Sequence, residues 1–418
     1  MGESSLPSCA LGERSVANVA APSGRRLNLA AVPKQGTPIV SIDLDLTLAC
    51  NLRCVYCFKE KDGQQMSKQV AFDAIVWLLY ASGRAKKLRV NLMGGEPLLR
   101  FDLIRHVVPF AKRRAACHGK EIHFSVTTNN TLVSDEIVAF WKQWGLGFHC
   151  SLDGIPMIQD RNRPMADGSG SSQLAEQGVA KILAYRPRTT ARCTVVPDSA
   201  PYILRNYDYF RSLGYVDIAM VPGDAREWSE PSIGVFEEQF REVADRVRDA
   251  MRSGVFIRVK GIDDYCEGEA RRKPREFACG AGRGMALIDV HGGIWPCHRW
   301  NKQGHQSWRM GSIYEDFCEA GRAPLDVRSQ TEFVRADCAS CSAARICGGG
   351  CLAENLEENG DVYVPHPNKC ALNRAWARVG EYFHDTLYTE HNETFMKRYY
   401  PPPGSQDQGQ ETAEHAAH

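Results

Sequence analysis

The amino-acid sequence predicts an α/β fold built on a parallel sheet and followed by a cysteine-rich region. Three observations lead to this class. Six short apolar runs suited to buried strands alternate with amphipathic stretches suited to helices. The chain has 418 residues, a length that allows two or three domains. Nine of its sixteen cysteines lie between residues 266 and 370, among many glycines.

The alternation of strands and helices predicts the connectivity. Parallel strands need right-handed helical crossovers, so the sheet is either an open wound sheet or a partial barrel. In both cases reactive groups gather in the loops that follow the carboxyl ends of the strands. The strands are expected near residues 38–47, 88–93, 121–127, 146–151, 190–196 and 215–221, and the helices near residues 67–82, 101–117, 134–145, 172–185, 201–213 and 234–252.

Composition divides the chain further. Residues 1–36 are rich in Ser, Ala, Pro and Gly and are expected to form a flexible arm, followed by the α/β core over residues 37–255. The cysteine-rich region is placed at residues 256–372, where bound metal would replace a large apolar core. A C-terminal helix is expected over residues 373–399, and the polar, proline-rich segment 400–418 is expected to be disordered.

Charge and hydropathy limit the partners. The 51 lysines and arginines nearly balance the 50 acidic residues, so the sequence predicts binding neither to nucleic acid nor to an anionic membrane. No apolar stretch reaches the roughly 18 to 20 residues of a membrane-spanning helix, and the N-terminus lacks the pattern of a secretory signal. We therefore expect a cytoplasmic protein whose clustered cysteines serve as metal or cluster ligands rather than as disulfides.

The first cysteine group follows the first expected strand. Cys50, Cys54 and Cys57 have the spacing C-x-x-x-C-x-x-C, and three thiolates this close can bind one iron–sulfur cluster. A [4Fe–4S] cube would then keep one iron open to a small molecule. The alternative is a tetrahedral zinc site completed by a histidine, and no histidine lies between residues 30 and 105.

This triad, with Tyr56 just before its last cysteine, resembles the signature of the radical S-adenosylmethionine superfamily. The resemblance implies a partial (β/α)6 TIM barrel of the radical SAM type. It also implies a catalytic [4Fe–4S] cluster whose open iron is chelated by S-adenosyl-L-methionine. Electron transfer from this cluster would cleave the cofactor to a 5′-deoxyadenosyl radical, so the resemblance implies an oxidoreductase.

Segments after the next strands resemble the cofactor-binding segments of the same family. The turn after the second strand resembles the glycine-rich turn that receives the cofactor's amino group, because bare glycine backbone lets a ligand approach closely. Taken alone, it is equally an ordinary turn. The third and fourth strands end in segments that resemble T-N-G, with Asn130 in place of glycine, and S-L/I-D-G. The cofactor-binding residues implied by this resemblance are Tyr56, Gly94, Gly95, Glu96, Pro97, Asn129, Ser151, Asp153 and Arg163.

The assignment of Arg163 depends on an H-D-x-x-R pattern. Asp160 and Arg163 fit this pattern, but Gln159 stands where the pattern has histidine. By resemblance, the arginine helps to hold the carboxylate of the cofactor. The alternative is that Arg163 is an ordinary surface arginine.

The C-terminal cysteines form a second, longer array. Cys279 and Cys297 flank Gly292, and the array continues as C-x2-C-x5-C-x3-C-x18-C from Cys338. This resembles the seven-cysteine extension named SPASM, with one additional residue in the last interval, which a loop absorbs easily. By resemblance, one auxiliary [4Fe–4S] cluster would be bound by Cys338, Cys341, Cys347 and Cys370, and a second by Cys279, Cys297 and Cys351. A zinc ribbon is the alternative for the paired cysteines.

The second auxiliary cluster lacks an obvious fourth ligand. Cys266 or Cys318 would complete it, or the site stays open to a substrate group. The remaining cysteines, among them Cys9, Cys117, Cys150 and Cys193, are expected to be small core residues or free thiols.

The resemblance favours a peptide-modifying enzyme. Relatives with this extension mostly modify peptides or proteins, and the segment Trp295–Trp300 is similar to that of maturases that crosslink or oxidise side chains of a ribosomally made peptide. The first alternative is a sulfatase-maturating enzyme that oxidises a Cys or Ser to formylglycine. Such enzymes carry an aspartate base where this chain has His298, which is either a proton acceptor or a structural histidine. The second alternative is a non-catalytic iron–sulfur or zinc protein.

The implied partners follow from this chemistry. They are a peptide or protein substrate and an external electron donor of the flavodoxin or ferredoxin type. Peptide maturases often carry an N-terminal leader-binding domain, and the 36-residue arm is too short for one. A separate leader-binding protein is therefore a further hypothesis.

Overall fold

The structure is a computed structural model. It describes residues 26–402, except 30, 31, 34, 35, 274, 276, 303, 319–324, 326–337 and 339. Most of the expected flexible arm and of the expected disordered tail therefore lies outside the described residues, as does Cys9.

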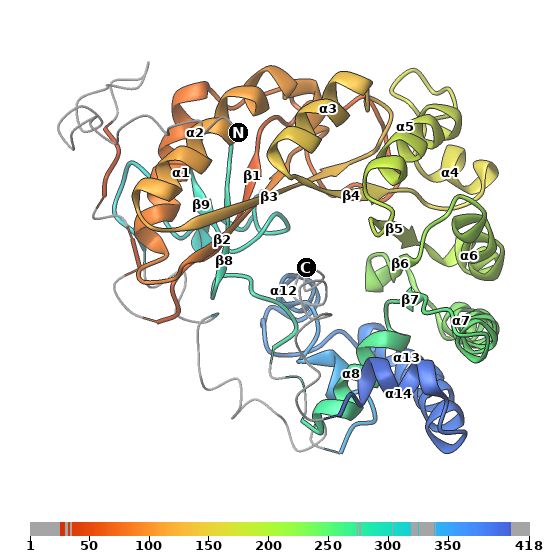
Figure 1. Ribbon diagram of the computed structural model, residues 1–418. Helices are drawn as coiled ribbons and strands as arrows, with labels where there is room; N and C mark the ends of the chain where they lie inside the picture. Colours follow the sequence, from red (N-terminus) through yellow and green to blue (C-terminus); the bar gives the residue numbers. More distant parts are fainter. Residues whose placement is uncertain are drawn as a thin grey trace.

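A curved, mainly parallel sheet forms the centre of the molecule. Within the described residues it has nine strands in the order β7-β6-β5-β4-β3-β2-β1-β8-β9, and only β9 runs antiparallel to its neighbour. All six expected strands are confirmed: β1 (Ser41–Asp45), β2 (Lys87–Met93), β3 (Glu121–Thr128), β4 (Gly147–Ser151), β5 (Thr190–Val195) and β6 (Asp217–Pro222). The sheet bends into an open arc, so the predicted α/β class with a partial barrel is confirmed (Figure 1).

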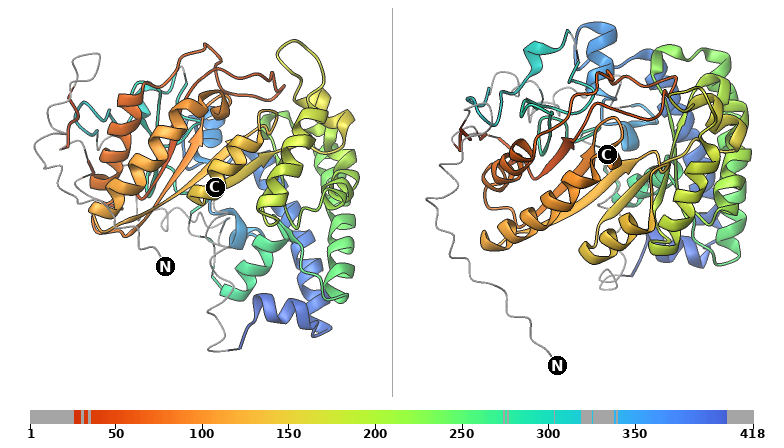
Figure 2. Two further views of the ribbon diagram at one scale, coloured as in Figure 1. Left: turned by 45° about the horizontal axis from the view of Figure 1, so that its top comes forward. Right: turned by 90° about the horizontal axis from the view of Figure 1, so that it is seen from above.

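Helices cover the outer face of this arc, as two further views also show (Figure 2). The six expected helices are confirmed as α1 (Lys68–Ala81), α2 (Phe101–Cys117), α3 (Asp135–Trp144), α5 (Ser172–Tyr185), α6 (Ile203–Ser212) and α7 (Glu230–Arg252). Local signals set their ends: the side chain of Ser134 accepts a hydrogen bond from the backbone of Ile137 at the start of α3, and Gly145 ends that helix in the left-handed conformation. The sequence analysis missed the short helix α4 (Pro156–Asn162).

The cysteine-rich region is joined to the core by the sheet itself. It contributes β7 (Arg258–Val259), β8 (Met285–Ile288) and β9 (Ile294–Trp295), and β8 lies beside β1 in parallel. The sequence analysis missed these strands because runs of two to four residues show no periodicity. The same region forms α8 (Ile262–Arg271), α11 (Ala344–Cys347) and α12 (Leu352–Asn359), and α12 lies on the concave side of the arc (Figure 1). The boundary at residue 256 remains a prediction.

The C-terminal segment is helical but is not one helix. The helix expected over residues 373–399 is divided into α13 (Pro367–Thr389) and α14 (Glu393–Tyr399). The break has a local cause: His391 adopts a positive φ of 50°, and the side chain of Asn392 accepts a hydrogen bond from the backbone of Phe395 and starts a new helix. Helix α13 packs against α7 and α8 and closes the open side of the sheet beyond β7.

The strands show which face of the sheet is available for chemistry. In β3, buried residues alternate with half-buried ones after the exposed first residue, Glu121. The buried set packs under the outer helices, so the half-buried set faces the concave side. In the part of the chain that the structure describes, no helix is long and apolar enough to cross a membrane.

Candidate active site

The expected cofactor-binding turn lies against the loop that carries the first cysteine triad. The backbone N–H of Gly95 donates to the carbonyl of Thr47 at 2.7 Å, and that of Glu96 donates to the carbonyl of Ala49 at 2.9 Å. A Cβ on Gly95 would lie 2.2 Å from the carbonyl oxygen of Ala49, and one on Gly94 would lie 2.2 Å from that of Thr47. Glycine is therefore required here so that the turn can pack against backbone, whereas the sequence analysis attributed it to approach by a ligand.

Replacing Gly95 by alanine should destabilise the protein. Because the added methyl group meets rigid backbone, the free energy of unfolding should fall by about 1–3 kcal/mol, measured by chemical denaturation. The matched control is Gly234→Ala, since a Cβ at Gly234 meets nothing within 4 Å and the position lies inside α7. That variant should be more stable by about 0.5–1 kcal/mol. Equal effects of the two substitutions would contradict the packing account.

Glu96 joins this turn to the end of β3. Its carboxylate accepts hydrogen bonds from the Thr128 hydroxyl at 2.8 Å, from the backbone of Asn129 at 2.8 Å and from the backbone of Leu98 at 3.1 Å. Burial raises the pKa of Glu96 to about 7, although these three hydrogen bonds act to lower it. The carboxylate of Glu96 therefore links the turn after β2 to the end of β3. Pro97 follows as the first residue of the short helix η1 (Pro97–Arg100).

The ends of β3 and β4 are tied to each other and to the cysteine loop. The side chain of Asn129 donates to Asn51 at 2.9 Å, next to Cys50. Asn130 has a φ of 68°, a conformation that asparagine tolerates better than most residues, which explains why it can replace glycine there. Its side chain donates to the carbonyl of Ser151 at 2.9 Å. Asn129 and Ser151, both implied by the resemblance, therefore lie at one edge of the sheet.

A buried ion pair lies beside the triad. Asp153 is fully buried, and its carboxylate pairs with Arg163 at 3.0 Å and accepts from the Tyr56 hydroxyl at 2.5 Å. The guanidinium of Arg163 lies 5.4 Å from the centre of the Tyr56 ring. Burial would lower the pKa of Arg163, but Asp153, Tyr56 and Cys54 together raise it above its ordinary value. The alternative that Arg163 is an ordinary surface residue is therefore wrong.

Gln159 takes a structural role at the position where the pattern has histidine. Its side-chain oxygen accepts from the backbone of Asp153 at 2.9 Å, and its amide donates to Ser171 at 2.9 Å. Ser171 in turn donates to the carbonyl of Arg163 at 2.6 Å. Gln159 thereby holds both partners of the buried ion pair in place.

The described cysteines are unbridged, the ten expected ligands among them. Burial raises the pKa of Cys54, and the nearby Cys57 thiol raises it further. Burial also raises the pKa of Cys50, and the Cys54 thiol adds to this rise. The sulfur of Cys50 accepts from the backbone of Leu52 at 3.4 Å. The first triad is therefore one neighbourhood of thiols at the end of β1.

Two groups of thiols act on one another in the C-terminal region, and their division as cluster ligands stays a prediction. Burial raises the pKa of Cys297 well above its ordinary value, and the Cys279 and Cys351 thiols raise it further. Burial raises the pKa of Cys370 to about 11, and three other thiols contribute to this rise. We call the first group, Cys279, Cys297 and Cys351, the proximal thiols, and the second, Cys338, Cys341, Cys347 and Cys370, the distal thiols.

The two candidates for a fourth proximal ligand differ in exposure. Cys266 is fully buried in α8, where Asp263 and Glu267 act on its thiol. Cys318 is exposed. Cys150 and Cys193 are buried in β4 and β5, as expected of small core residues.

The donor chemistry of the expected ligands fits iron–sulfur clusters, because all ten are thiols. Among the described residues, no three His, Cys, Asp or Glu side chains are close enough to hold one metal ion. A cube binds its thiolates at different irons and therefore spaces them more widely than a single ion does. Buried thiols that raise one another's pKa need compensating cations to exist as thiolates, and iron supplies this charge.

The concave face carries a polar network that the sequence analysis missed. The side chain of Asn91 donates to Asp43 at 3.2 Å and accepts from Ser125 at 3.1 Å. His298 pairs with the other oxygen of Asp43 at 3.2 Å. The signal that could have revealed this network is the alternation of polar side chains within otherwise apolar strands. The network places His298 on the concave side of the sheet, next to β1.

An open pocket of about 330 Å³ adjoins the triad. It is lined by Val55, Tyr56, Val196, Pro197, Asp198 and Glu227. These residues come from the cysteine loop and from the loops that follow β5 and β6, so the pocket opens at the carboxyl ends of the strands.

Comparisons with known proteins agree with this architecture. A model of the radical SAM superfamily matches residues 44–201. A serine-type anaerobic sulfatase-maturating enzyme of Klebsiella aerogenes is 24% identical over 398 residues, which cover 88% of this chain and 90% of that protein. Native anSMEcpe with bound AdoMet and Kp18Cys peptide has a TM-score of 0.69 at 18% identity, covering 84% of this chain and 100% of the other. Streptococcus suis SuiB bound to precursor peptide SuiA has a TM-score of 0.56 at 13% identity, and the match covers 80% of this chain and 76% of the other.

Proposed function

Because this chain carries a radical S-adenosylmethionine domain in residues 44–201, we propose that it oxidises a cysteine or serine side chain of a peptide or protein to formylglycine. The observation that carries this proposal is the similarity to a serine-type anaerobic sulfatase-maturating enzyme along nearly the whole of both chains. The alternative weighed in the sequence analysis is thus better supported than side-chain crosslinking. The peptide in the anSMEcpe structure supports a peptide partner.

Three groups of thiols support the cofactor content. We propose that Cys50, Cys54 and Cys57 hold the catalytic [4Fe–4S] cluster, and that the proximal and distal thiols, as a SPASM-type region, hold one auxiliary cluster each. With S-adenosylmethionine bound, the catalytic cluster would supply a nucleoside radical that removes a hydrogen atom from the substrate carbon. The positions of Cys266 and Cys318 favour a proximal site that is open at its fourth corner.

The protein's own residues would position the cofactor. Tyr56 lines the open pocket beside the triad, and its hydroxyl is held by the buried carboxylate of Asp153. Arg163 presents a permanent positive charge next to Cys54, where the carboxylate of the cofactor would be neutralised. The turn Gly94–Pro97, the side chain of Asn129 and the end of β4 at Ser151 complete the edge to which the cofactor would bind.

His298 is the proposed proton acceptor. Oxidation of a serine side chain to an aldehyde removes one hydrogen atom, one proton and one electron, so a base is needed. The ring of His298 is oriented by Asp43 and stacks on Phe58, with centroids 5.4 Å apart. A carboxylate bonded to one ring nitrogen leaves the other free to accept a proton. The electron would pass to the auxiliary clusters, and an external donor of the flavodoxin or ferredoxin type would reduce the catalytic cluster.

A second candidate is crosslinking of a ribosomally made peptide. The observation that favours it is His298, which stands where sulfatase-maturating enzymes are expected to carry aspartate. The fold likeness to SuiB bound to precursor peptide SuiA agrees with it. A separate leader-binding protein would belong to this candidate only.

The two candidates predict different products from one assay. Anaerobically reconstituted protein, a reductant and S-adenosylmethionine should convert a sulfatase-type Cys or Ser peptide to an aldehyde, detected by mass spectrometry after hydroxylamine trapping. A serine peptide would lose two hydrogens in forming the aldehyde, whereas a cysteine peptide would form a thioaldehyde that water hydrolyses with release of hydrogen sulfide. A crosslinked peptide would also lose two hydrogens, but it would not react with hydroxylamine. Cofactor cleavage without trapping of any such peptide would contradict the formylglycine proposal, while leaving the radical chemistry in place.

A further inference from the structure

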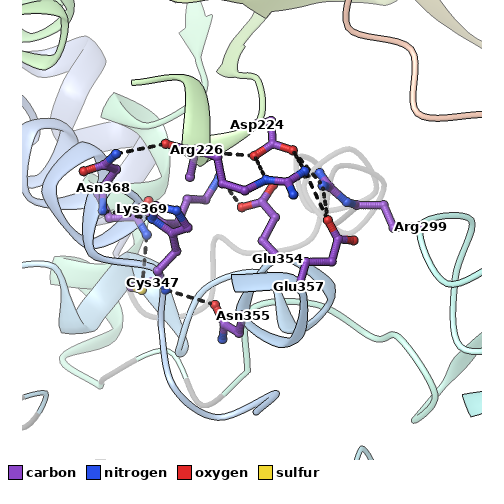
Figure 3. Close-up of polar contacts among 12 residues, drawn as sticks. Asp224, Arg226, Arg299, Cys347, Glu354, Asn355, Glu357, Asn368 and Lys369 are labelled. Carbon is purple, nitrogen blue, oxygen red and sulfur yellow. Dashed lines mark hydrogen bonds and ion pairs between the residues drawn. The ribbon is translucent and has the colours of Figure 1, made fainter. Parts of the chain in front are cut away.

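A cluster of acidic and basic side chains lies beside Cys351, one of the proximal thiols. Its carboxylates are Asp224, Glu354 and Glu357, and its cations include Arg226, Arg299 and Lys302. They come from the loop after β6, from the segment after Cys297 and from α12. Figure 3 shows all of them except Lys302 close together. Arg299 is at the centre: it pairs with Glu354 at 2.8 Å and lies 3.6 Å from Asp224.

Arg299 and Glu354 are each close in sequence to one of the proximal thiols. Arg299 follows Cys297 by two residues, and Glu354 lies in the first turn of α12, whose N-cap is Cys351. The ion pair therefore links two chain segments that each carry a proposed cluster ligand, although the partners are 55 residues apart in sequence. Both side chains are largely buried, with 17% of the Arg299 side chain and 7% of the Glu354 side chain exposed.

The two charges act on the same sulfur with opposite signs. Burial raises the pKa of Cys351, the Glu354 carboxylate raises it further, and the Arg299 guanidinium lowers it. The guanidinium is also 5.5 Å from the ring centre of Phe58, the residue after Cys57. Water screens these charges little because they are buried.

Stability alone is a weak explanation for such a pair. Burying two charges costs solvation free energy, and apolar side chains of similar size are often as stabilising. A fixed charge beside a cluster, in contrast, changes its reduction potential, because net charge and solvent exposure around the sulfurs set that potential.

We propose that the opposite charges of Arg299 and Glu354 together set the reduction potential of the cluster bound by Cys279, Cys297 and Cys351. The proposal rests on the proposed function, in which these thiols hold a cluster. Arg299 favours the reduced state of that cluster and Glu354 opposes it. The pair thereby adjusts how readily the cluster accepts an electron during oxidation of the substrate.

The test is a redox titration of reconstituted protein, followed by electron paramagnetic resonance. Arg299→Gln should shift the potential of the proximal cluster to more negative values, and Glu354→Gln should shift it to more positive values. Arg299→Lys, which keeps the charge, should remain near the wild type. The potential of the catalytic cluster in the same molecule should shift less than that of the proximal cluster, and iron content should be unchanged.

The control is Arg226→Gln. Arg226 belongs to the same cluster of charges, but its ion pairs are with Asp224 at 2.6 Å and Glu357 at 3.4 Å. Its removal should move the proximal potential less than removal of Arg299 does. If Arg299→Gln does not fold, Glu354→Gln tests the same proposal, and the potential of the proximal cluster should then become more positive.

Two results would overturn the proposal. Either both substitutions shift the proximal potential in one direction, as general loosening would do, or neither shifts it while the proximal signal is present. A wild-type protein with no signal from a cluster at these thiols would instead refute the proposed cluster content, and the inference with it.

Discussion

Replacing Cys54 by alanine is expected to abolish reductive cleavage of S-adenosylmethionine. Cys54 is the middle thiol of the triad, and its neighbours include Cys57, Arg163 and Asp153. Two thiolates cannot hold the cube with one iron open, so iron should fall from about twelve to about eight atoms per chain. Iron analysis and chromatography of 5′-deoxyadenosine measure the two effects, and the deoxyadenosine yield should fall to background.

The matched control is Cys117→Ala, which removes an exposed thiol at the end of α2. This variant should keep both the iron and the cleavage activity of the wild type. The auxiliary signals should also survive in Cys54→Ala, because the proximal and distal thiols belong to other segments of the chain. Full activity of Cys54→Ala would contradict the assignment of the triad.

Replacing Asp153 by asparagine should destabilise the protein severely. Arg163 stays charged at any accessible pH, and without Asp153 its guanidinium would be buried beside a neutral amide. Removing one partner of a buried ion pair typically costs about 3–5 kcal/mol, and here the hydrogen bond with Tyr56 is weakened as well. Urea denaturation of the reconstituted protein, followed by circular dichroism, measures the loss.

An exposed ion pair provides the comparison. Arg105 and Glu136 are 2.9 Å apart, and more than half of each side chain is exposed. Glu136→Gln should therefore change the free energy of unfolding by no more than about 1 kcal/mol. If Asp153→Asn lowered the free energy of unfolding by as little, the buried ion pair of Asp153 and Arg163 would not be needed for stability.

Much of the fold could be predicted from sequence because the signals are local. Helices α2 and α5 have the bounds expected from periodicity, since an amphipathic pattern of this length distinguishes helix from strand. The break at His391 was missed because an unfavourable φ at one residue leaves no periodic trace. Strand β8 was missed because pairing with β1, and not its own four residues, makes it a strand.

The site shows the same division. Cysteine spacing predicts the first triad, because its three thiols are close in sequence. The division of the C-terminal cysteines is implied only by the family resemblance and stays a prediction. The roles of Gly95 and Gln159 could not be predicted, since they depend on backbone from distant segments. Nothing in the sequence pairs Arg299 with Glu354 or His298 with Asp43, because such contacts form only when segments far apart in the sequence fold together.

The central claim is that three groups of thiols bind three clusters, one of which activates S-adenosylmethionine. Anaerobic reconstitution of the wild-type chain, with iron and zinc analysis and an assay for 5′-deoxyadenosine after reduction, tests it most directly. We expect about twelve irons per chain and cofactor cleavage that depends on the reductant. Zinc in place of iron, or iron without any cleavage of the cofactor, would contradict the account.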